Sequence, residues 1–245
     1  MHLSRFFCDI SLNTNEIIQL PHEVVHHIKV LRLKHGDNIL LFNGLGGEYM
    51  SSLIITNKNF FAEIREHIKN EMELSGHITL AQAITSKNKM DFIIEKSIEL
   101  GVQHIIPMQT QRCNNHITSD NLEKSLSHWR RVIISASEQC GRSLLARIDK
   151  CVYLNNYLMQ PREDPIIMCD PLSKNNIFDV LEIIKDTKSL TIMVGPEGGW
   201  SEKELDLVTN LNNIYPMRFG SRILRTETAG IAVISAISNM LRWNL

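Results

Sequence analysis

The stretch that most constrains how this chain folds is residues 190–232, where two strand-turn-helix units follow each other. The first begins with an apolar, β-branched run at residues 190–194, which predicts a buried strand. The turn Gly-Pro-Glu-Gly-Gly at residues 195–199 comes next. We expect a helix to begin after Ser201, because Glu204 stands at the spacing that completes a capping box.

The second unit of this stretch repeats the plan of the first. The sequence predicts a short strand at residues 217–219, a turn at Gly220 and a helix that begins at Thr226. Turns of this kind lie at the carboxyl ends of parallel strands, where open α/β sheets bind ligands. Glycines in the first turn leave bare backbone that a ligand can approach closely. We therefore expect a ligand site between the two turns.

The first turn differs from two common phosphate-binding loops. It lacks the Gly-Lys-Ser/Thr ending of a P-loop and the G-x-G-x-x-G spacing of a dinucleotide fingerprint. The sequence therefore disfavours a nucleoside triphosphate or a nicotinamide cofactor. A tight turn that needs glycine and binds nothing stays open as an alternative.

Composition narrows the class of protein. A length of 245 residues allows one large domain or two modest ones, and 43% hydrophobic with 22% charged residues is ordinary for a globular protein. No apolar run approaches the ~20 residues that span a bilayer, and the start has no signal-peptide pattern, so we expect a cytoplasmic protein with no membrane partner. Five cysteines without a C-x-x-C pair argue against a disulfide framework and a metal site. A net charge of -1 means that RNA binding would need local basic patches.

The first 72 residues predict a small barrel of short strands. The strands are expected at residues 37–42, 48–55 and 59–64. The run N-G-L-G-G at residues 43–47 resembles a cofactor loop, but a strand pattern follows it, so a hairpin turn is the better interpretation. The polar stretch 66–77 predicts a boundary, which divides the chain into domains at residues 1–72 and 73–245.

A helix is expected ahead of these strands, within residues 21–35. Its apolar residues fall at one-face spacing and predict a buried face made of Val24, Val25, Ile28 and Leu31. The adjacent pair of histidines has no acidic or cysteine partner at ligand spacing, which disfavours a metal. The polar face is either simply solvated or contacts RNA phosphates. The candidate RNA contacts of the chain are Arg5, Lys29, Arg32, Lys34 and Arg112.

Residues 73–245 alternate between strand and helix patterns, which predicts an α/β domain with a mostly parallel sheet. The expected strands are residues 78–84, 104–108, 166–169, 190–194 and 217–219. The expected helices are residues 89–100, 121–139, 177–185, 202–210 and 226–242. Residues 150–164 show little periodicity and are expected to form a loop with a short strand.

The chain resembles the knotted SPOUT class of S-adenosylmethionine-dependent RNA methyltransferases and, within it, the RsmE family. The two most specific motifs are G-P-E-G-G-W-S at residues 195–201 and F-G-S-R-I-L-R-T-E-T-A at residues 219–229. The runs V-L-R at 30–32, M-D-F-I-I-E-K-S at 90–97 and S-E-Q-C-G-R at 137–142 also resemble family signatures. The resemblance therefore covers nearly the whole chain.

This resemblance implies a fold and a function. It implies a trefoil-knotted, mostly parallel sheet with helices on both faces, behind an N-terminal PUA-like barrel that binds RNA. The implied reaction is methylation of N3 of a uridine in 16S ribosomal RNA, on the assembled small ribosomal subunit. The implied cofactor is S-adenosylmethionine, and the implied assembly is a homodimer.

The resemblance also implies the residues of the site. In this class the cofactor is bent and lies among three loops, and the third loop here would follow the strand that ends at Cys169. The implied cofactor contacts are Pro171, Leu172, Gly195, Pro196, Glu197, Gly198, Gly199, Phe219, Gly220, Ile223, Leu224, Thr226, Thr228 and Ala229. The catalytic candidates are Arg225 as the charge-stabilising group, Glu138 as the proton acceptor and Arg142 as a phosphate or base contact.

The chemistry of the uracil ring explains these choices. N3 carries a proton between two carbonyls and becomes nucleophilic when the proton leaves, so the site must stabilise negative charge and accept a proton. A guanidinium is always protonated and offers a fork of donors to carbonyl oxygens, which favours Arg225. Alternatively, Arg225 forms a structural salt bridge with Glu197 or Glu227. Glu197 itself either pairs with the positive end of the cofactor or caps the following helix.

Three other interpretations remain open. Cys140 could be the nucleophile of a pyrimidine C5 methylation, although Trp129, Ile133 and Ala136 precede it at helical spacing and favour a small buried residue. The chain could be another SPOUT enzyme, acting on a ribose 2′-oxygen or on a transfer RNA base. It could also be a non-enzymatic RNA-binding protein of ribosome assembly.

Overall fold

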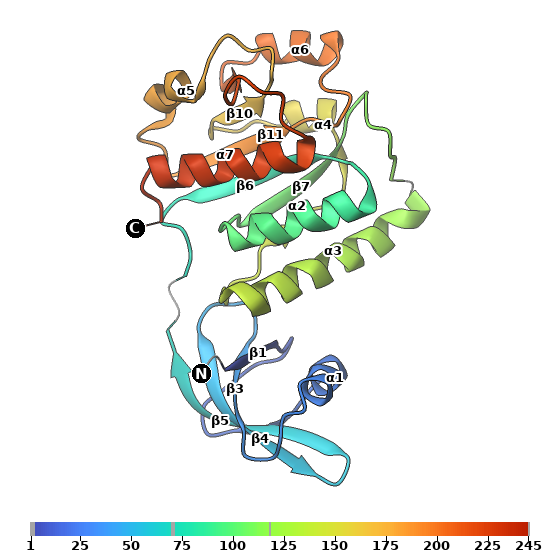
Figure 1. The fold of residues 1–245 in the computed structure, drawn as a ribbon, viewed down its shortest axis with the longest axis vertical. Coiled ribbons are helices and arrows are strands. Elements are labelled where there is room, and N and C mark those ends of the chain that lie inside the picture. The colour runs from blue at the N-terminus through green and yellow to red at the C-terminus, as the bar shows by residue number, and fades with distance from the viewer. Residues whose placement is uncertain (1–2, 70–71, 118, 245) are drawn as a thin grey trace. The chain divides into compact units, whose positions relative to one another are not determined.

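The structure is a computed structural model that describes residues 3–69, 72–117 and 119–244 (Figure 1). The chain divides into two compact units. The first consists of Met1–Glu73 with Ile134–Leu145, and the second of Leu74–Ile133 with Ala146–Leu245. The segment 134–145 thus groups with the N-terminal unit, whereas the sequence suggested one division after residue 72. Residues 70–71, in the polar stretch expected at that division, lie outside the described residues.

The first unit is built on a five-stranded sheet with the strand order β1-β3-β4-β5-β2. The strands are β1 (Ser4–Phe7), β2 (Ile17–Gln19), β3 (Asn38–Phe42), β4 (Glu48–Thr56) and β5 (Asn59–Ile68). β1 pairs with β3 in parallel, and the other neighbours are antiparallel. Buried side chains from the sheet and from helix α1 (His22–Val30) form one apolar core. The three predicted strands are confirmed, whereas β1 and β2 were not predicted.

The glycine-rich run at residues 43–47 is a hairpin turn, as predicted, because it joins the antiparallel strands β3 and β4. Its tip also meets the segment 134–145 within the first unit. The carbonyl of Gly44 accepts the N–H of Leu145 at 3.2 Å, and the N–H of Gly46 donates to the carbonyl of Ser143 at 3.3 Å. These backbone bonds help to explain why a segment distant in sequence belongs to this unit.

Helix α1 corrects one prediction about its buried face. Val24 and Ile28 are buried as expected, but Leu31 is 53% exposed. The helix ends at Val30, and Arg32 takes a left-handed conformation with φ 57°, so the chain turns away before Leu31 can reach the core. Leu33 packs against the apolar core instead.

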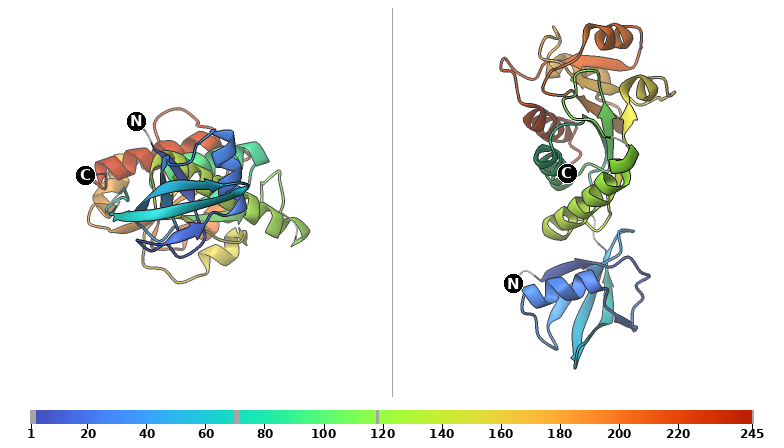
Figure 2. Two further views of the ribbon diagram at one scale, coloured as in Figure 1. Left: turned by 90° about the horizontal axis from the view of Figure 1, so that it is seen from below. Right: turned by 90° about the vertical axis from the view of Figure 1, so that its right-hand side faces the viewer.

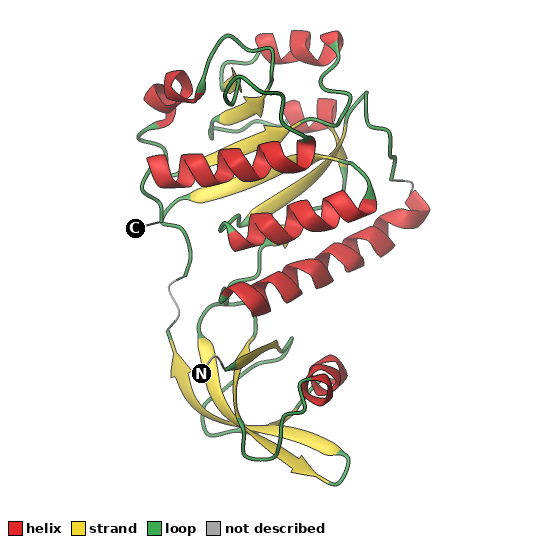
Figure 3. Cartoon of the chain, viewed as in Figure 1, coloured by secondary structure: helices red, strands yellow, loops and turns green. Residues whose placement is uncertain are grey.

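The second unit is an α/β structure on a seven-stranded sheet with the order β12-β10-β11-β6-β7-β8, and β9 also pairs with β7 (Figure 3). Neighbouring strands are parallel. The strands are β6 (His77–Ala83), β7 (His104–Gln109), β8 (Arg147–Ile148), β9 (Val152–Tyr153), β10 (Ile166–Cys169), β11 (Ser189–Val194) and β12 (Ile214–Met217). The helices are α2 (Lys87–Glu99), α3 (Ser119–Cys140), α4 (Leu154–Leu158), α5 (Ile177–Ile184), α6 (Glu202–Thr209) and α7 (Thr226–Met240). Residues 134–140 of α3 belong to the first unit.

Helices cover both faces of this sheet, as predicted. Figures 1 and 2 place α2 and α7 on one face, where a Cβ added to Gly230 of α7 would meet Val194 and Leu80 at 3.4 and 3.6 Å. The alternate strand residues face the other way, and Ala81 and Met193 join an apolar cluster with side chains of α4 and α6. The trefoil knot stays a prediction.

Most predicted elements of the second unit are confirmed, but strand β8 was not predicted, and two further regions differ. The last strand was expected at residues 217–219, but β12 covers Ile214–Met217. Pro216 lies within β12, which is the edge strand, where the missing N–H of a proline is tolerated. Residues 150–164 contain the expected short strand, β9, and also helix α4, which was not predicted. No helix among the described residues is long and apolar enough to cross a membrane.

Candidate active site

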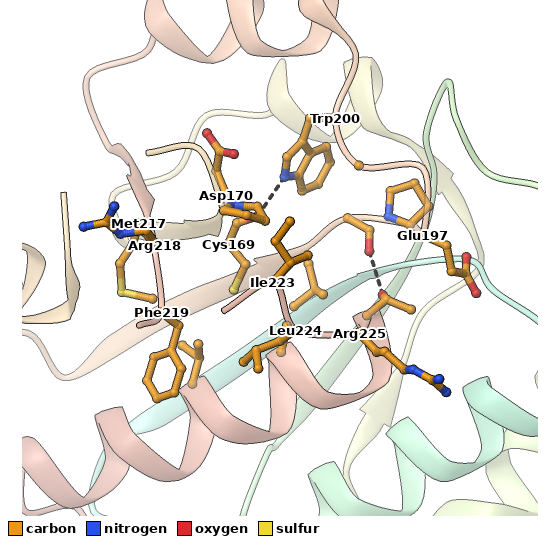
Figure 4. Close-up of a pocket in the computed structure, with 18 of the residues that line it drawn as sticks. Cys169, Asp170, Glu197, Trp200, Met217, Arg218, Phe219, Ile223, Leu224 and Arg225 are labelled. Atoms are coloured by element: carbon orange, nitrogen blue, oxygen red, sulfur yellow. Dashed lines mark hydrogen bonds between the residues drawn. The ribbon is translucent and has the colours of Figure 1, made fainter. Parts of the chain in front are cut away.

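A pocket of about 400 Å³ lies at the carboxyl ends of β10, β11 and β12, and residues of the second unit line it (Figure 4). β10 lies between β11 and β12, so the loops after these three parallel strands meet at one edge of the sheet. The predicted residues in its lining are Pro171, Gly195, Pro196, Glu197, Gly199, Phe219, Ile223, Leu224, Arg225, Thr226 and Ala229. Leu172, Gly198, Gly220 and Thr228 were also predicted but do not line it.

Several lining residues were not predicted from the sequence. They are Lys89, Cys169, Val194, Trp200, Met217, Arg218 and Val233, whereas Asp170 and Arg222 lie within the predicted loops but were not named as contacts. Trp200 and Cys169 form a wall, where the indole Nε1 donates to the carbonyl of Cys169 at 2.9 Å (Figure 4). Burial raises the pKa of the Cys169 thiol to about 12, so this sulfur is a neutral thiol at physiological pH.

Thr226, at the start of α7, joins the loop after β11 to the middle of the sheet. Its hydroxyl donates to the carbonyl of Gly195 at 2.6 Å and accepts from the Gln82 amide at 3.1 Å. Gln82 is fully buried in β6. A polar side chain inside an apolar strand pattern was the signal for this contact, since a buried amide needs a hydrogen-bond partner.

Arg112, proposed from the sequence as an RNA contact, holds the loop 195–199 from the other side. Its guanidinium donates to the carbonyl of Gly198 at 3.2 Å. A Cβ at Gly198 would lie 3.0 Å from the Arg112 Cβ and 3.1 Å from its carbonyl oxygen. Close approach to Arg112 therefore explains the glycine at position 198, whereas Gly199 has φ 66° and lines the pocket.

An ionic cluster stands at the rim of the pocket. The ammonium of Lys89, from α2, lies 3.0 Å from Glu197 Oε1 and 3.2 Å from Glu227 Oε2. The Thr85 hydroxyl, ahead of α2, donates to the same oxygen of Glu197. Helix capping is therefore not what holds Glu197, because Ser201 and Glu204 form the capping box of α6.

The cluster keeps Lys89 and Glu197 charged. Burial disfavours the charged form of Glu197, but the hydrogen bonds from Thr85, from its own backbone and from Lys89 outweigh that effect and lower its pKa. The hydrogen bonds to Glu197 and then to Glu227 raise the pKa of Lys89. The rim therefore carries a fixed ion pair at neutral pH.

Arg225 also lines the pocket, and its side chain is 81% exposed. The nearest carboxylate oxygen, on Glu227, is 3.9 Å away, at the limit of an ion pair. Arg225 is the N-cap residue of α7, where a cation is unfavourable for the helix dipole. Helix stability therefore does not explain an arginine at this position.

The other two catalytic candidates, Glu138 and Arg142, belong to the first unit. Glu138 accepts the N–H of Phe7 at 2.9 Å, and burial raises the pKa of its carboxyl. Arg142 is 4% exposed and forms a bidentate pair with Glu73, with distances of 2.8 and 2.6 Å. Their catalytic roles stay predictions.

The basic residues proposed to contact RNA differ in their surroundings. The Arg5 guanidinium is buried and lies 2.6 Å from a carboxylate oxygen of Glu48. Lys29, Arg32 and Lys34 are exposed, and the Lys29 ammonium lies over the ring of Phe60. Exposed cations can reach a phosphate, whereas Arg5 is paired inside its own unit. No group of potential metal ligands occurs among the described residues.

Comparison with known proteins shows which family this chain belongs to. Residues 72–238 match the RNA methyltransferase domain, and residues 20–65 match the RNA methyltransferase PUA domain. The chain is 32% identical to ribosomal RNA small subunit methyltransferase E of Buchnera aphidicola subsp. Schizaphis graminum, over 96% of this chain and 95% of the relative. It is 31% identical to the protein of that name in Rickettsia conorii, over 97% and 96%.

The chain belongs to the ribosomal RNA small subunit methyltransferase E family. A crystal structure of the Neisseria gonorrhoeae member of this family, bound to S-adenosylmethionine, matches 98% of both chains with 32% identity and a TM-score of 0.90. As a member of this RsmE family the chain is an RNA methyltransferase, and the α/β fold with a PUA domain is confirmed.

Proposed function

We propose that this chain transfers the methyl group of S-adenosylmethionine to N3 of a uridine in 16S ribosomal RNA. The observation that carries the proposal is the pocket, because both specific family motifs, at residues 195–201 and 219–229, contribute to its lining. The N-terminal barrel would bind the RNA.

The pocket fits the methyl donor in size and chemistry. Its volume of about 400 Å³ is within the range of small-molecule sites. Apolar side chains such as Leu224 and Val233 suit an adenine ring, while Glu197 offers a negative charge to the ammonium of the methionine end. When bound, the donor supplies a methyl group on a positively charged sulfur.

The side chains of this chain would supply the rest of the chemistry. Arg225 would donate hydrogen bonds to a uracil carbonyl oxygen and stabilise the negative charge that develops when N3 loses its proton. The raised pKa of Glu138 suits a proton acceptor, and Arg142 would contact the RNA only if its buried pair with Glu73 opened. None of these roles requires a covalent intermediate with the protein.

The assembly and the partners belong to the same proposal. The substrate would be the assembled small ribosomal subunit, and the protein would act in the cytoplasm as a homodimer. The apolar helix α7 would be buried in the trefoil knot or the dimer. Exposed Lys29, Arg32 and Lys34 would contact RNA phosphates.

Analysis of the modified nucleosides tests this proposal. Unmodified small subunits are incubated with the protein and S-adenosylmethionine, and the digested RNA is examined by mass spectrometry. We expect N3-methyluridine. A 2′-O-methyl nucleoside would assign the chain to another SPOUT activity. If calorimetry detects no binding at about millimolar S-adenosylmethionine, the upper end of the usual KM range, a non-enzymatic role would replace the proposal.

A further inference from the structure

The rim of the pocket contains a lysine that the proposed reaction has not yet used. The Lys89 ammonium lies between two carboxylates from different segments, Glu197 after β11 and Glu227 in the first turn of α7. Both carboxylates are within 3.2 Å of the same nitrogen. Without that cation, two neighbouring negative charges would repel each other and disfavour ionisation of both.

The hydrogen bonds of Glu197 leave one of its oxygens available. Thr85 and Lys89 both donate to Oε1, whereas Oε2 receives no side-chain donor among the described residues. Glu197 lines the pocket, so a cationic group of a ligand can reach this carboxylate. The other charged groups near this side of the loop are Glu227 and Arg225 at the start of α7 and Arg112 after β7.

We propose that Lys89 is a positioning residue that keeps Glu197 ionised and oriented to bind the ammonium group of the donor's methionine end. This inference rests on the proposed function, since it concerns the same methyl-donor site. The adenosine part of the donor is neutral, so its binding does not depend on the charge of Glu197.

Binding measured across pH separates this role from simple structural support. In the wild type Glu197 stays ionised down to below its ordinary pKa, so affinity for S-adenosylmethionine should change little from about pH 7, where the donor's ammonium is charged, to about pH 5. In Lys89→Met the pKa of Glu197 rises, because burial and Glu227 then act without the cation. Affinity should then fall by about tenfold per pH unit below the raised pKa, as linkage to one proton requires.

Three ligands and three further variants make the test specific. The titrations use S-adenosylmethionine, S-adenosylhomocysteine, which keeps the ammonium, and methylthioadenosine, which lacks the methionine end. In Lys89→Met the first two should lose affinity as the pH falls, and the third should not. Lys89→Arg should restore the flat profile. Lys87→Met removes a lysine at the exposed start of the same helix, outside the pocket lining, and should behave as wild type.

Glu197→Gln provides an independent check, because it should bind weakly at every pH, like Lys89→Met at low pH. A loss in Lys89→Met that is equal for all three ligands and independent of pH would make Lys89 a structural residue and overturn the inference. An unchanged profile would overturn it as well. If the wild type itself binds no S-adenosylmethionine, the proposed function fails together with the inference, and that outcome is seen before any variant is made.

Discussion

The two motif loops of the pocket are held in different ways. The first loop, residues 195–199, is fixed from three sides by Thr226, by Arg112 and by the pair of Thr85 and Lys89. In the second loop, residues 219–224, no residue forms a hydrogen bond within the part of the chain that the structure describes. Ile223 in this loop is 81% exposed.

This difference indicates that the two loops have different roles. Polar contacts from three other segments pre-organise the first loop, which lowers the cost of ordering it around a ligand. The second loop has no such hydrogen bonds among the described residues, and its apolar and cationic side chains line the pocket without polar contacts to hold them in place. Changes in the first loop should therefore affect donor affinity, and changes at the end of the second should affect the rate.

The largest effect is expected for Arg225→Lys, which follows directly on the second loop. The change keeps the charge but removes the planar fork of donors. If Arg225 stabilises the uracil anion, the methylation rate should fall by roughly 10²–10³, the scale for loss of one oxyanion donor. Donor affinity should change little, because an interaction made in the transition state leaves ground-state binding intact.

Single-turnover methylation of small ribosomal subunits, run beside calorimetry with S-adenosylmethionine, measures both quantities. Arg222→Lys serves as the control, since Arg222 also lines the pocket from within the second loop. Equal losses of rate and affinity in Arg225→Lys would make Arg225 a donor-binding residue and remove the contrast between the loops.

The next effect is expected in the first loop. Gly198→Val would press a branched side chain against Arg112, where even a Cβ would lie 3.1 Å from a backbone oxygen that cannot turn away. Overpacking of this kind costs about 1–3 kcal/mol, so donor affinity should fall by about ten- to a hundredfold.

Gly220→Ala is the matched change in the second loop. A Cβ at Gly220 meets nothing within 4 Å, and only its φ of 74° opposes the change, which costs about 1–2 kcal/mol. Because that loop has few restraints, it can relax, and donor affinity should fall less than in Gly198→Val. Calorimetry on both variants decides the order, and the reverse order would show that the second loop is the rigid one.

A smaller effect is expected where Thr226 joins the first loop to the sheet. Thr226→Val removes the hydroxyl and leaves the buried Gln82 amide without this partner, which costs about 1–3 kcal/mol of stability. The melting temperature should fall by several degrees, and donor affinity by up to about tenfold.

Thr228→Val makes the same chemical change on the exposed side of the same helical turn, outside the pocket lining. It should alter neither the melting temperature nor the affinity. Thermal unfolding and calorimetry on the two variants give the comparison directly. Equal effects at the two positions would mean that the bond to Gly195 does not restrain the first loop.

The same contrast explains how much of the fold the sequence could predict. The first loop was placed correctly because its signals are local: an apolar strand, a glycine turn, and the capping pair of Ser201 and Glu204. The strand before the second loop was placed too late, because Pro216 is acceptable only where tertiary structure makes β12 an edge strand. The grouping of residues 134–145 with the first unit depends on long-range backbone bonds that leave no periodic pattern.

The sequence predicted the parts of the candidate site that lie within a motif. The two C-terminal motifs supplied most of the predicted pocket lining, but Lys89 and Gln82 come from other elements. Their roles follow from distances to Glu197 and Thr226, across more than a hundred residues of sequence, and no local spacing encodes them. Gly198 was expected to expose backbone to the ligand. In the structure, a Cβ at this position would instead crowd Arg112.

The smallest effect is expected outside both loops, at Cys140. Methylation of N3 needs no covalent adduct with the protein, so Cys140→Ser should keep the full single-turnover rate and donor affinity. The cysteine that does line the pocket, Cys169, has its pKa raised to about 12 by burial, so it is a neutral thiol at neutral pH. Circular dichroism establishes that the Cys140→Ser protein is folded before its rate is measured.

A folded variant that binds S-adenosylmethionine but no longer methylates RNA would point to attack by sulfur and to a C5-methylated pyrimidine. The proposed roles of Arg225 and of the second loop would then have to be reassigned.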